Sequence, residues 1–300
     1  MLSRDADACF WIGRYVERAE ATARMVDVHY HAALESGLPG IEGADSPMRW
    51  DSLLAISHTA EEFYKHYDVY SDRNFLHHFA FDTENPNSIL VSWSRARENA
   101  RSIREQIASE MWEAINISYL QFRDWDVDRI LAEGPHAFFN RVKNASHLFQ
   151  GILNRTLLMS ETRDWLDIGR FLERGDQTAR LLDVKYHDLL PAYQEEDAES
   201  VEPLGVGSTM DMHGWIAVLK SVSAFEMYRK IYRGGILPAS VVDFLVLHPQ
   251  FPASVNHCVK RVEGCLKRIS GNSSSAPSTE PERVVGRLVA DLTYSRPEEI

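Results

Sequence analysis

The sequence has little of what marks several large classes of protein. Only three of its 300 residues are cysteines, and no two of them have the close spacing of a metal site. No stretch reaches the roughly 18 apolar residues of a membrane-spanning helix, and the charged start of the chain is unlike a signal peptide. We therefore expect an unprocessed cytoplasmic protein with reduced thiols that does not enter a membrane.

An excess of positive charge is also missing. The formal net charge is −12 at pH 7 and the isoelectric point is near 5.5, which argues against a general affinity for nucleic acid or for anionic membranes. The chain lacks a phosphate loop, a dinucleotide glycine motif, a Gly-x-Ser-x-Gly elbow and a His-Glu-x-x-His sequence. The histidines are scattered, and we expect them, His77 and His78 included, at the surface. The residues alone indicate no reaction and leave open whether the chain is an enzyme.

What the sequence does contain is an internal repeat. Eleven of the nineteen residues from Gly13 to His31 recur from Gly169 to His187, 156 residues later, whereas unrelated segments of that length share roughly one. Weaker matches follow, among them Ser88 with Ser254 and Arg95 with Arg261. Because most of the recurring residues of the first segment are charged or polar, an electrostatic arrangement has been copied as well as a packing surface.

Helical periodicity dominates the chain. Apolar residues over 10–34 fall on one side of a helix at about 100° per residue, and further helices are expected over about 51–67, over 88–116 with Ser88 as N-cap, and over 136–160. Loops are expected over 36–49 and 191–211, and periodicity does not assign the apolar run 241–247. We predict an all-α helical bundle of two fused helical repeats related by pseudo-twofold symmetry. The first repeat spans 1–135, the second spans 136–270 and packs on the first, and 271–300 form a flexible linker with a short C-terminal helix.

The charged residues of the repeated helix form a stripe beside its apolar face, and the glycine at the start of the stripe lets another backbone come close. In the first copy the cluster comprises Arg14, Glu17, Arg18, Glu20, Arg24, Asp27 and His31, and in the second Arg170, Glu173, Arg174, Asp176, Arg180, Asp183 and His187. One interpretation is a pair of partly buried ion networks that fix how the repeats dock. The other is a single site pooled from both copies, in which carboxylates and imidazoles bind a metal. The arginines already neutralise the acids, so we expect no metal and no other cofactor, although the metal alternative stays open.

A second charged constellation lies on the helix expected over 88–116. Its members are Arg97, Glu98, Arg101, Arg104, Glu110 and Glu113. The set is typical of an exposed helix with internal ion pairs. Alternatively, the guanidinium groups form a face that binds a carboxylate, a phosphate or a protein partner.

Three segments resemble the bacterial alpha-E domain family: MLSRDADACFWIGRYVERAEATARMVD, ARENARSIREQIASEMWEAIN and DIGRFLERGDQTARLLDV. The resemblance covers the chain to about residue 270, and Asp5, Cys9 and Asp176 depart from the usual pattern. The residues matched to the family motifs are Arg14, Glu17, Arg18, Glu20, Arg24, Glu98, Arg101, Glu110 and Glu113. The resemblance implies an all-helical fold and an association with circularly permuted ATP-grasp proteins and transglutaminase-like proteins in peptide or amide ligation.

The resemblance thus favours an accessory or partner protein of an ATP-grasp-type amide ligase, which docks the ligase or holds a peptide-like substrate through its charged helices. Two alternatives stay open. One is a metal- or carboxylate-dependent enzyme with its site between the two repeats, and the other is a purely structural scaffold. The sequence does not decide whether the chain forms a homo-oligomer.

Overall fold

The computed structural model describes residues 1–35, 48–189, 209–274 and 276–299, and over these ranges the chain is helical without a β-strand, which confirms the all-α class. The elements are α1 (Ser3–Glu35), α2 (Met48–Ser57), α3 (Ala60–His66), α4 (Asp72–Ala80), α5 (Ile89–Ser102), α6 (Ser109–Arg123), α7 (Val127–Glu133), α8 (Pro135–Thr156), α9 (Glu161–Leu189), α10 (Thr209–Ser221), α11 (Phe225–Ile231), α12 (Pro238–Val242), the π-helical turn η1 (Asp243–Leu247), α13 (Val255–Ser270), α14 (Glu280–Tyr294) and the 3₁₀ turn η2 (Pro297–Glu299). The predicted loops fall mostly on 36–47 and 190–208, outside the described residues. No helix of the described part is long and apolar enough to cross a membrane.

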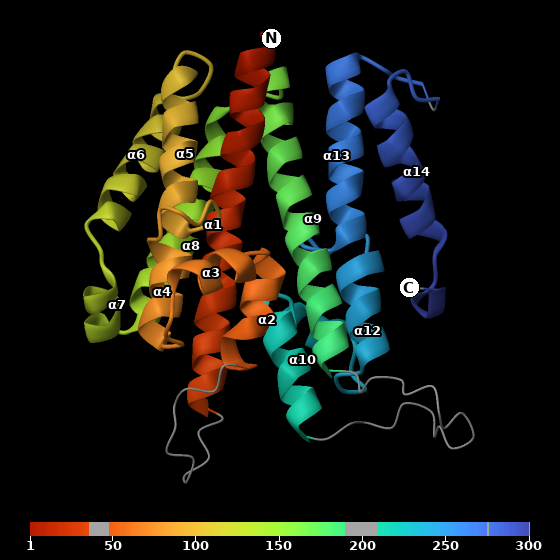
Figure 1. Ribbon diagram of the computed structural model, residues 1–300. Coiled ribbons are helices and arrows are strands. Elements are labelled where there is room, and N and C mark those ends of the chain that lie inside the picture. The colour runs from red at the N-terminus through yellow and green to blue at the C-terminus, as the bar shows by residue number, and fades with distance from the viewer. Residues whose placement is uncertain (36–47, 190–208, 275, 300) are drawn as a thin grey trace.

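The two long helices that carry the repeated sequence, α1 and α9, lie side by side at the centre of the bundle (Figure 1). They run in the same direction, because the amino group of Met1 lies 3.0 Å from the carboxylate of Glu161 at the start of α9. Helices α5 and α8 pack on α1, and α13 packs on α9, with α6 and α14 outside them. One cluster of buried apolar side chains extends through both halves of the chain. The expected division at residue 135 and the pseudo-twofold relation stay predictions.

Backbone contact between α1 and α9 occurs at the repeated glycines. A Cβ atom on Gly13 would lie closer than 3.0 Å to the carbonyl oxygen of Leu166 and to the amide nitrogen of Arg170. A Cβ atom on Gly169 would lie equally close to the carbonyl oxygen of Phe10. The expectation that this glycine admits a neighbouring backbone is therefore confirmed, and both copies use it for the same contact.

Corresponding helices begin with the same N-cap. The Ser88 hydroxyl accepts a hydrogen bond from the Val91 amide at 3.3 Å, and the Ser254 hydroxyl accepts one from the His257 amide at 3.1 Å. Each cap satisfies one of the amides that a helix start leaves without an intrahelical partner. The predicted cap at Ser88 is confirmed, and its counterpart starts α13 against α9 as Ser88 starts α5 against α1.

Several predicted elements differ from the structure. The helix expected over 88–116 is interrupted between Ser102 and Ser109, and the helix expected over 51–67 breaks at His58, whose φ of 53° is left-handed. The apolar run 241–247 ends α12 and forms η1.

His78 is fully buried, and its ring nitrogens lie 2.9 Å from the Thr59 hydroxyl and 3.3 Å from an Asp82 carboxylate oxygen. The expected surface position of His78 is wrong, because these polar partners replace water.

The glycine contact predicts a large effect of one added methyl group. Gly13→Ala should lower the free energy of unfolding by about 3 kcal/mol, because overpacking against a backbone that cannot rotate away forces the two helices apart. Urea denaturation followed by circular dichroism measures the change.

The matched control is Gly151→Ala, also in the interior of a helix but with open space around the added atom. This variant should gain about 0.5–1 kcal/mol, since alanine is the better helix former. Equal stability changes in the two variants would contradict the proposed contact.

Candidate functional site

Two Glu-Arg pairs cross between the central helices just beyond the glycine contact. Arg18 of α1 donates to Glu173 of α9 from Nε and Nη2, at 2.7 and 3.0 Å. In return, Arg174 of α9 donates to Glu17 of α1 from Nε and Nη2, at 2.5 and 3.0 Å. Each arginine therefore binds the glutamate of the other copy with a two-pronged contact, the geometry that gives strong charge-assisted hydrogen bonds. We call Glu17, Arg18, Glu173 and Arg174 the crossed seam.

The two carboxylates of the crossed seam are buried while its arginines are partly exposed, and further side chains saturate the carboxylates. Glu17 and Glu173 are only 3% and 0% exposed. Gln150 of α8 donates to Glu17 at 3.1 Å, and Gln177 donates to Glu173 at 3.1 Å. Arg14 adds a third guanidinium contact, with Glu173 at 2.5 Å. A buried carboxylate with this many donors is fully compensated, as burial of a charge requires.

The two copies differ beside the crossed seam. Arg170, the counterpart of Arg14, lies 2.8 Å from Asp167 on its own helix, and its Nε has no hydrogen-bond partner among the described residues. Asp167 occupies the position that Trp11 has in the first copy. The acid therefore draws Arg170 away from Glu17, so Glu173 has two arginine partners and Glu17 has one.

Burial and charge act in opposite directions on the pKa values of the seam. Burial by itself would raise the pKa of Glu173, but the hydrogen bond and charge of Arg18, together with the charge of Arg14, lower it below its ordinary value. Burial would likewise lower the pKa of Arg174, and Glu17 outweighs it and raises that pKa. The pKa of Arg170 is lowered, because burial and the neighbouring guanidinium groups outweigh the attraction of Asp167. Glu173 is therefore an anion at neutral pH.

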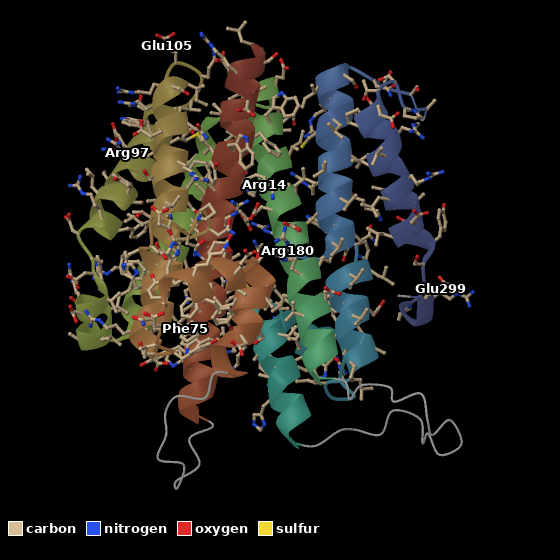
Figure 2. All side chains as sticks on the ribbon, viewed as in Figure 1. Arg14, Phe75, Arg97, Glu105, Arg180 and Glu299 are labelled. Atoms are coloured by element: carbon tan, nitrogen blue, oxygen red, sulfur yellow. The ribbon has the colours of Figure 1, made fainter. Side chains whose placement is uncertain are left out.

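Several other predicted cluster residues pair within their own helix. Arg24 pairs with Glu20, and Arg180 pairs with Asp176 at 2.9 Å, each within its own helix. Arg14 and Arg180, labelled in Figure 2, mark the line that these charges follow along the central helices. Asp183 is exposed, and the side chain of His187 lies outside the described residues. The structure thus brings together Arg14, Glu17, Arg18, Glu173, Arg174 and Asp176 out of the two predicted clusters.

Asp27 has partners on another helix. Its carboxylate, 4% exposed, accepts a hydrogen bond from Lys143 of α8 at 2.7 Å and lies 3.0 Å from Nδ1 of His136, at the start of α8. His31, one turn further along α1, has Nε2 at 3.5 Å from the same carboxylate. Among the described residues, Asp27, His31 and His136 are the group of three whose ligand atoms lie close enough together to hold a metal ion.

The second predicted constellation lies on two helices joined by a turn, because the chain breaks after Ser102. Arg97 donates to Asn116 of α6 and to Glu98, each at 2.7 Å, and Arg101 pairs with Glu98 at 2.6 Å. The guanidinium carbons of Arg97 and Arg104 lie 5.8 and 4.9 Å from the Trp112 ring centre. Glu110 and Glu113 are exposed on α6. The internal ion pairs that the sequence suggests are therefore present, and two of the arginines lie beside the Trp112 ring.

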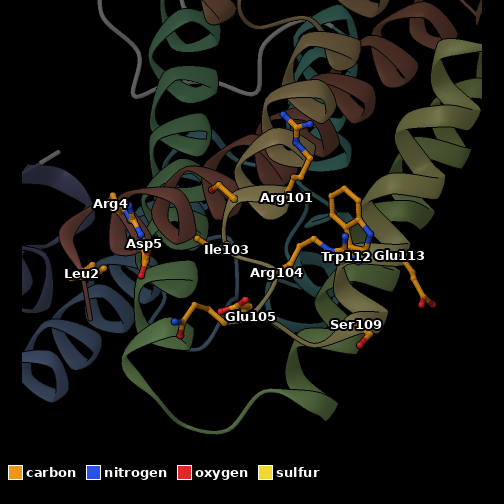
Figure 3. Close-up of a pocket in the computed structure, with 12 residues that line it drawn as sticks. Leu2, Arg4, Asp5, Arg101, Ile103, Arg104, Glu105, Ser109, Trp112 and Glu113 are labelled. Atoms are coloured by element: carbon orange, nitrogen blue, oxygen red, sulfur yellow. Dashed lines mark ion pairs between the residues drawn. The ribbon is translucent and has the colours of Figure 1, made fainter.

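This turn forms one wall of a cleft of about 750 Å³. The residues drawn in Figure 3 place Arg101, Arg104 and Trp112 on one side and Leu2, Arg4 and Asp5, from the start of α1, on the other. We call this the α5–α6 cleft. Three guanidinium groups in an open cleft suit a carboxylate or phosphate, and the lining acids Asp5, Glu105 and Glu113 suit an amine.

Comparison with known proteins shows the family of the chain. The family model called Alpha-E, described as a predicted alpha-helical domain with a conserved ER motif, matches residues 1–300. The chain belongs to the Alpha-E family. Glu-Arg occurs at 17–18, 173–174 and 282–283, and the first two occurrences form the crossed seam. The match also extends through the tail after residue 270, which the sequence resemblance left out.

Curated relatives of the Alpha-E chain are uncharacterized mycobacterial proteins. One from Mycobacterium bovis and one from Mycobacterium tuberculosis are each 24% identical over 319 residues, which cover 97% of this chain and 32% of the relative. The chain thus spans about a third of the length of the curated relatives it matches. No solved structure matches the chain.

The sequence did not predict several residues that contact the crossed seam, Asp27 or Arg170. Gln150, Lys143 and His136 all come from α8, and Asp167 comes from the turn of α9 before the repeated arginines. The repeat could not reveal the α8 residues, because it specifies which residues recur and not which third helix lies against them. Asp167 could have been found as an acid three residues before Arg170 on the same helix.

Removal of one charge from the crossed seam should strongly lower the free energy of unfolding. Glu173→Gln should cost about 3 kcal/mol of unfolding free energy, because it leaves the partly buried Arg14 and Arg18 without their carboxylate. Chemical denaturation measures the loss. Glu61→Gln is the control, since Glu61 makes a comparable pair with Lys65 at 2.6 Å but is exposed on α3, and it should change little.

The lowered pKa of Glu173 also predicts an acid-dependent loss. The folded pKa lies below the value of about 4.3 for an unfolded glutamate, so the pair stabilises fully above that value and its contribution is lost as pH falls through the folded pKa. Denaturation at several pH values should therefore show a stability gap between wild type and Glu173→Gln that is constant from pH 7 to about pH 4.3 and narrows as the pH falls further to pH 3. A gap that stays constant down to pH 3 would contradict an ionised Glu173.

Proposed function

We propose that this chain is an accessory module of a cytoplasmic ATP-grasp-type amide-ligase system and that it holds a peptide-like substrate for the ligase. Two observations support the proposal. The resemblance to the alpha-E family implies an association with circularly permuted ATP-grasp and transglutaminase-like proteins. In addition, the mycobacterial relatives carry the matched segment within chains about three times as long. A segment that is joined to other protein in its relatives fits a module that works beside a partner.

The crossed seam is a poor contact surface for such a partner. Its carboxylates are buried and occupied by arginines of the same chain, so a substrate would have to break buried ion pairs to reach them. The role that the seam supports is to hold α1 and α9 in register. Binding therefore has to occur on a surface that this framework supports.

The α5–α6 cleft is the surface whose chemistry fits a peptide best. Arg4, Arg101 and Arg104 offer guanidinium groups for a carboxylate, and Trp112 offers an apolar face. Acids also line the cleft, so the amine of a peptide finds a counter-charge near the arginines that would bind its carboxylate. An uncompensated cationic pocket would attract any anion, whereas this mixture favours a ligand with both charges.

The test of the proposal uses a circularly permuted ATP-grasp ligase as the candidate partner. Co-purification and the rate of amide formation, measured with and without the chain, should show association and a faster ligation. Arg101→Gln combined with Arg104→Gln should raise KM for the peptide about tenfold or more, because charge-assisted hydrogen bonds contribute about 1.5–3 kcal/mol each.

The control variant is Arg229→Gln. Arg229 is also an exposed arginine over an aromatic ring, 5.7 Å from the centre of Phe225, but it lies on α11 in the second half of the chain. It should leave KM unchanged. Absence of association together with an unchanged ligation rate would overturn the proposal.

A further inference from the structure

We propose that Asp27, His31 and His136 form a binding site for a divalent transition metal of the zinc class. The site is independent of the α5–α6 cleft and of the ligase role. It joins two elements, because Asp27 and His31 lie one turn apart on α1 and His136 is the second residue of α8. The sequence placed the first two residues in a charged stripe, and the structure adds the third ligand from a helix outside the repeat.

The separations between the ligand atoms fit a tetrahedral ion. Zinc bonds of about 2.0–2.1 Å to nitrogen and oxygen place neighbouring tetrahedral ligands about 3.3 Å apart. Nδ1 of His136 lies 3.0 Å from Oδ1 of Asp27, and Nε2 of His31 lies 3.5 Å from the same oxygen. All three ligand atoms lie within 4.8 Å of one another. The two imidazoles are exposed, so their side chains have room to rotate toward the ideal separation.

The ligand positions are fixed by local structure. Asp27 and His31 are four residues apart on a helix, which places their side chains on one face. His136 follows Pro135, the first residue of α8, and Gly134 before it has a φ of 91° that few other residues adopt. The buried carboxylate anchors the site, and the two imidazoles are half exposed, so an ion can enter from solvent.

Lys143 determines which metals the site favours. Its ammonium donates to Oδ2 of Asp27 at 2.7 Å, which orients the carboxylate as outer hydrogen bonds orient metal ligands. The same ammonium offsets the charge of the carboxylate. A hard ion such as Mg²⁺ or Ca²⁺, which depends on carboxylate charge, therefore gains little, whereas ions that bind imidazole nitrogen well keep most of their attraction. With three protein ligands, a fourth position is left for water or substrate.

The test is a titration of the untagged, metal-stripped protein. Zn²⁺ in isothermal calorimetry should bind in a one-to-one ratio, and Mg²⁺ at the same concentrations should give no heat of binding. Co²⁺ should produce the visible absorption of a low-symmetry site. His31→Ala and His136→Ala should each weaken Zn²⁺ binding at least tenfold and abolish the Co²⁺ absorption.

His147→Ala provides the matched control. His147 is an exposed histidine whose Nε2 lies 4.0 Å from the carboxylate of Glu20 on α1. Among the described residues, it does not belong to the group of three that could hold a metal ion. It should retain full affinity, and circular dichroism should show all three variants folded, since the replaced side chains are exposed. Absence of Zn²⁺ binding by the wild type, or affinity retained by the His31→Ala and His136→Ala double variant, would overturn the proposal. Either result leaves the ligase role untouched, because that role is read from ligation and not from metal content.

Discussion

The structure depends on the contact of two helix backbones at Gly13 and Gly169. At that separation no side chain fits between α1 and α9, so every side chain of the next turn must either leave the contact or find its partner across it. The next turn carries Glu-Arg in both copies, and each arginine reaches the glutamate opposite. Close approach and crossed pairing are therefore one constraint: the glycines bring the charges within reach, and the charges hold the glycines in register.

A buried ion network of this kind contributes more to specificity than to net stability. Dehydration of the four charges offsets much of their attraction, and an apolar seam of similar volume would stabilise at least as well. An apolar seam, however, would tolerate a shift of one helix along the other. In this protein a shift of one turn would leave Glu17 and Glu173 without their arginine partners. Because α5 and α8 pack on α1 and α13 packs on α9, the register of the central pair sets the positions of both outer layers.

The sequence could predict those features that recur within one helix. The all-α class, the cap at Ser88 and the glycine contact follow from periodicity and from the repeat. What it could not predict are the pairings between helices. The position of Arg18 on a stripe does not show that its partner is Glu173, and nothing near Asp27 along the chain points to His136, 109 residues away. The burial of His78 was missed for the same reason, since Thr59 comes from a separate helix start.

The physical state of the seam also bears on where chemistry can occur. A general acid or base needs a pKa near the working pH and a free position for the proton it moves. The arginines lower the pKa of Glu173 and occupy its oxygens, and Glu17 is similarly enclosed by Arg174 and Gln150. Glu173 therefore lacks both requirements, and Glu17 lacks a free position for a proton. The polar groups that remain open to ligands lie away from the seam, in the α5–α6 cleft near the start of α1 and at Asp27 in its later turns, so binding at either place leaves the central ion pairs intact.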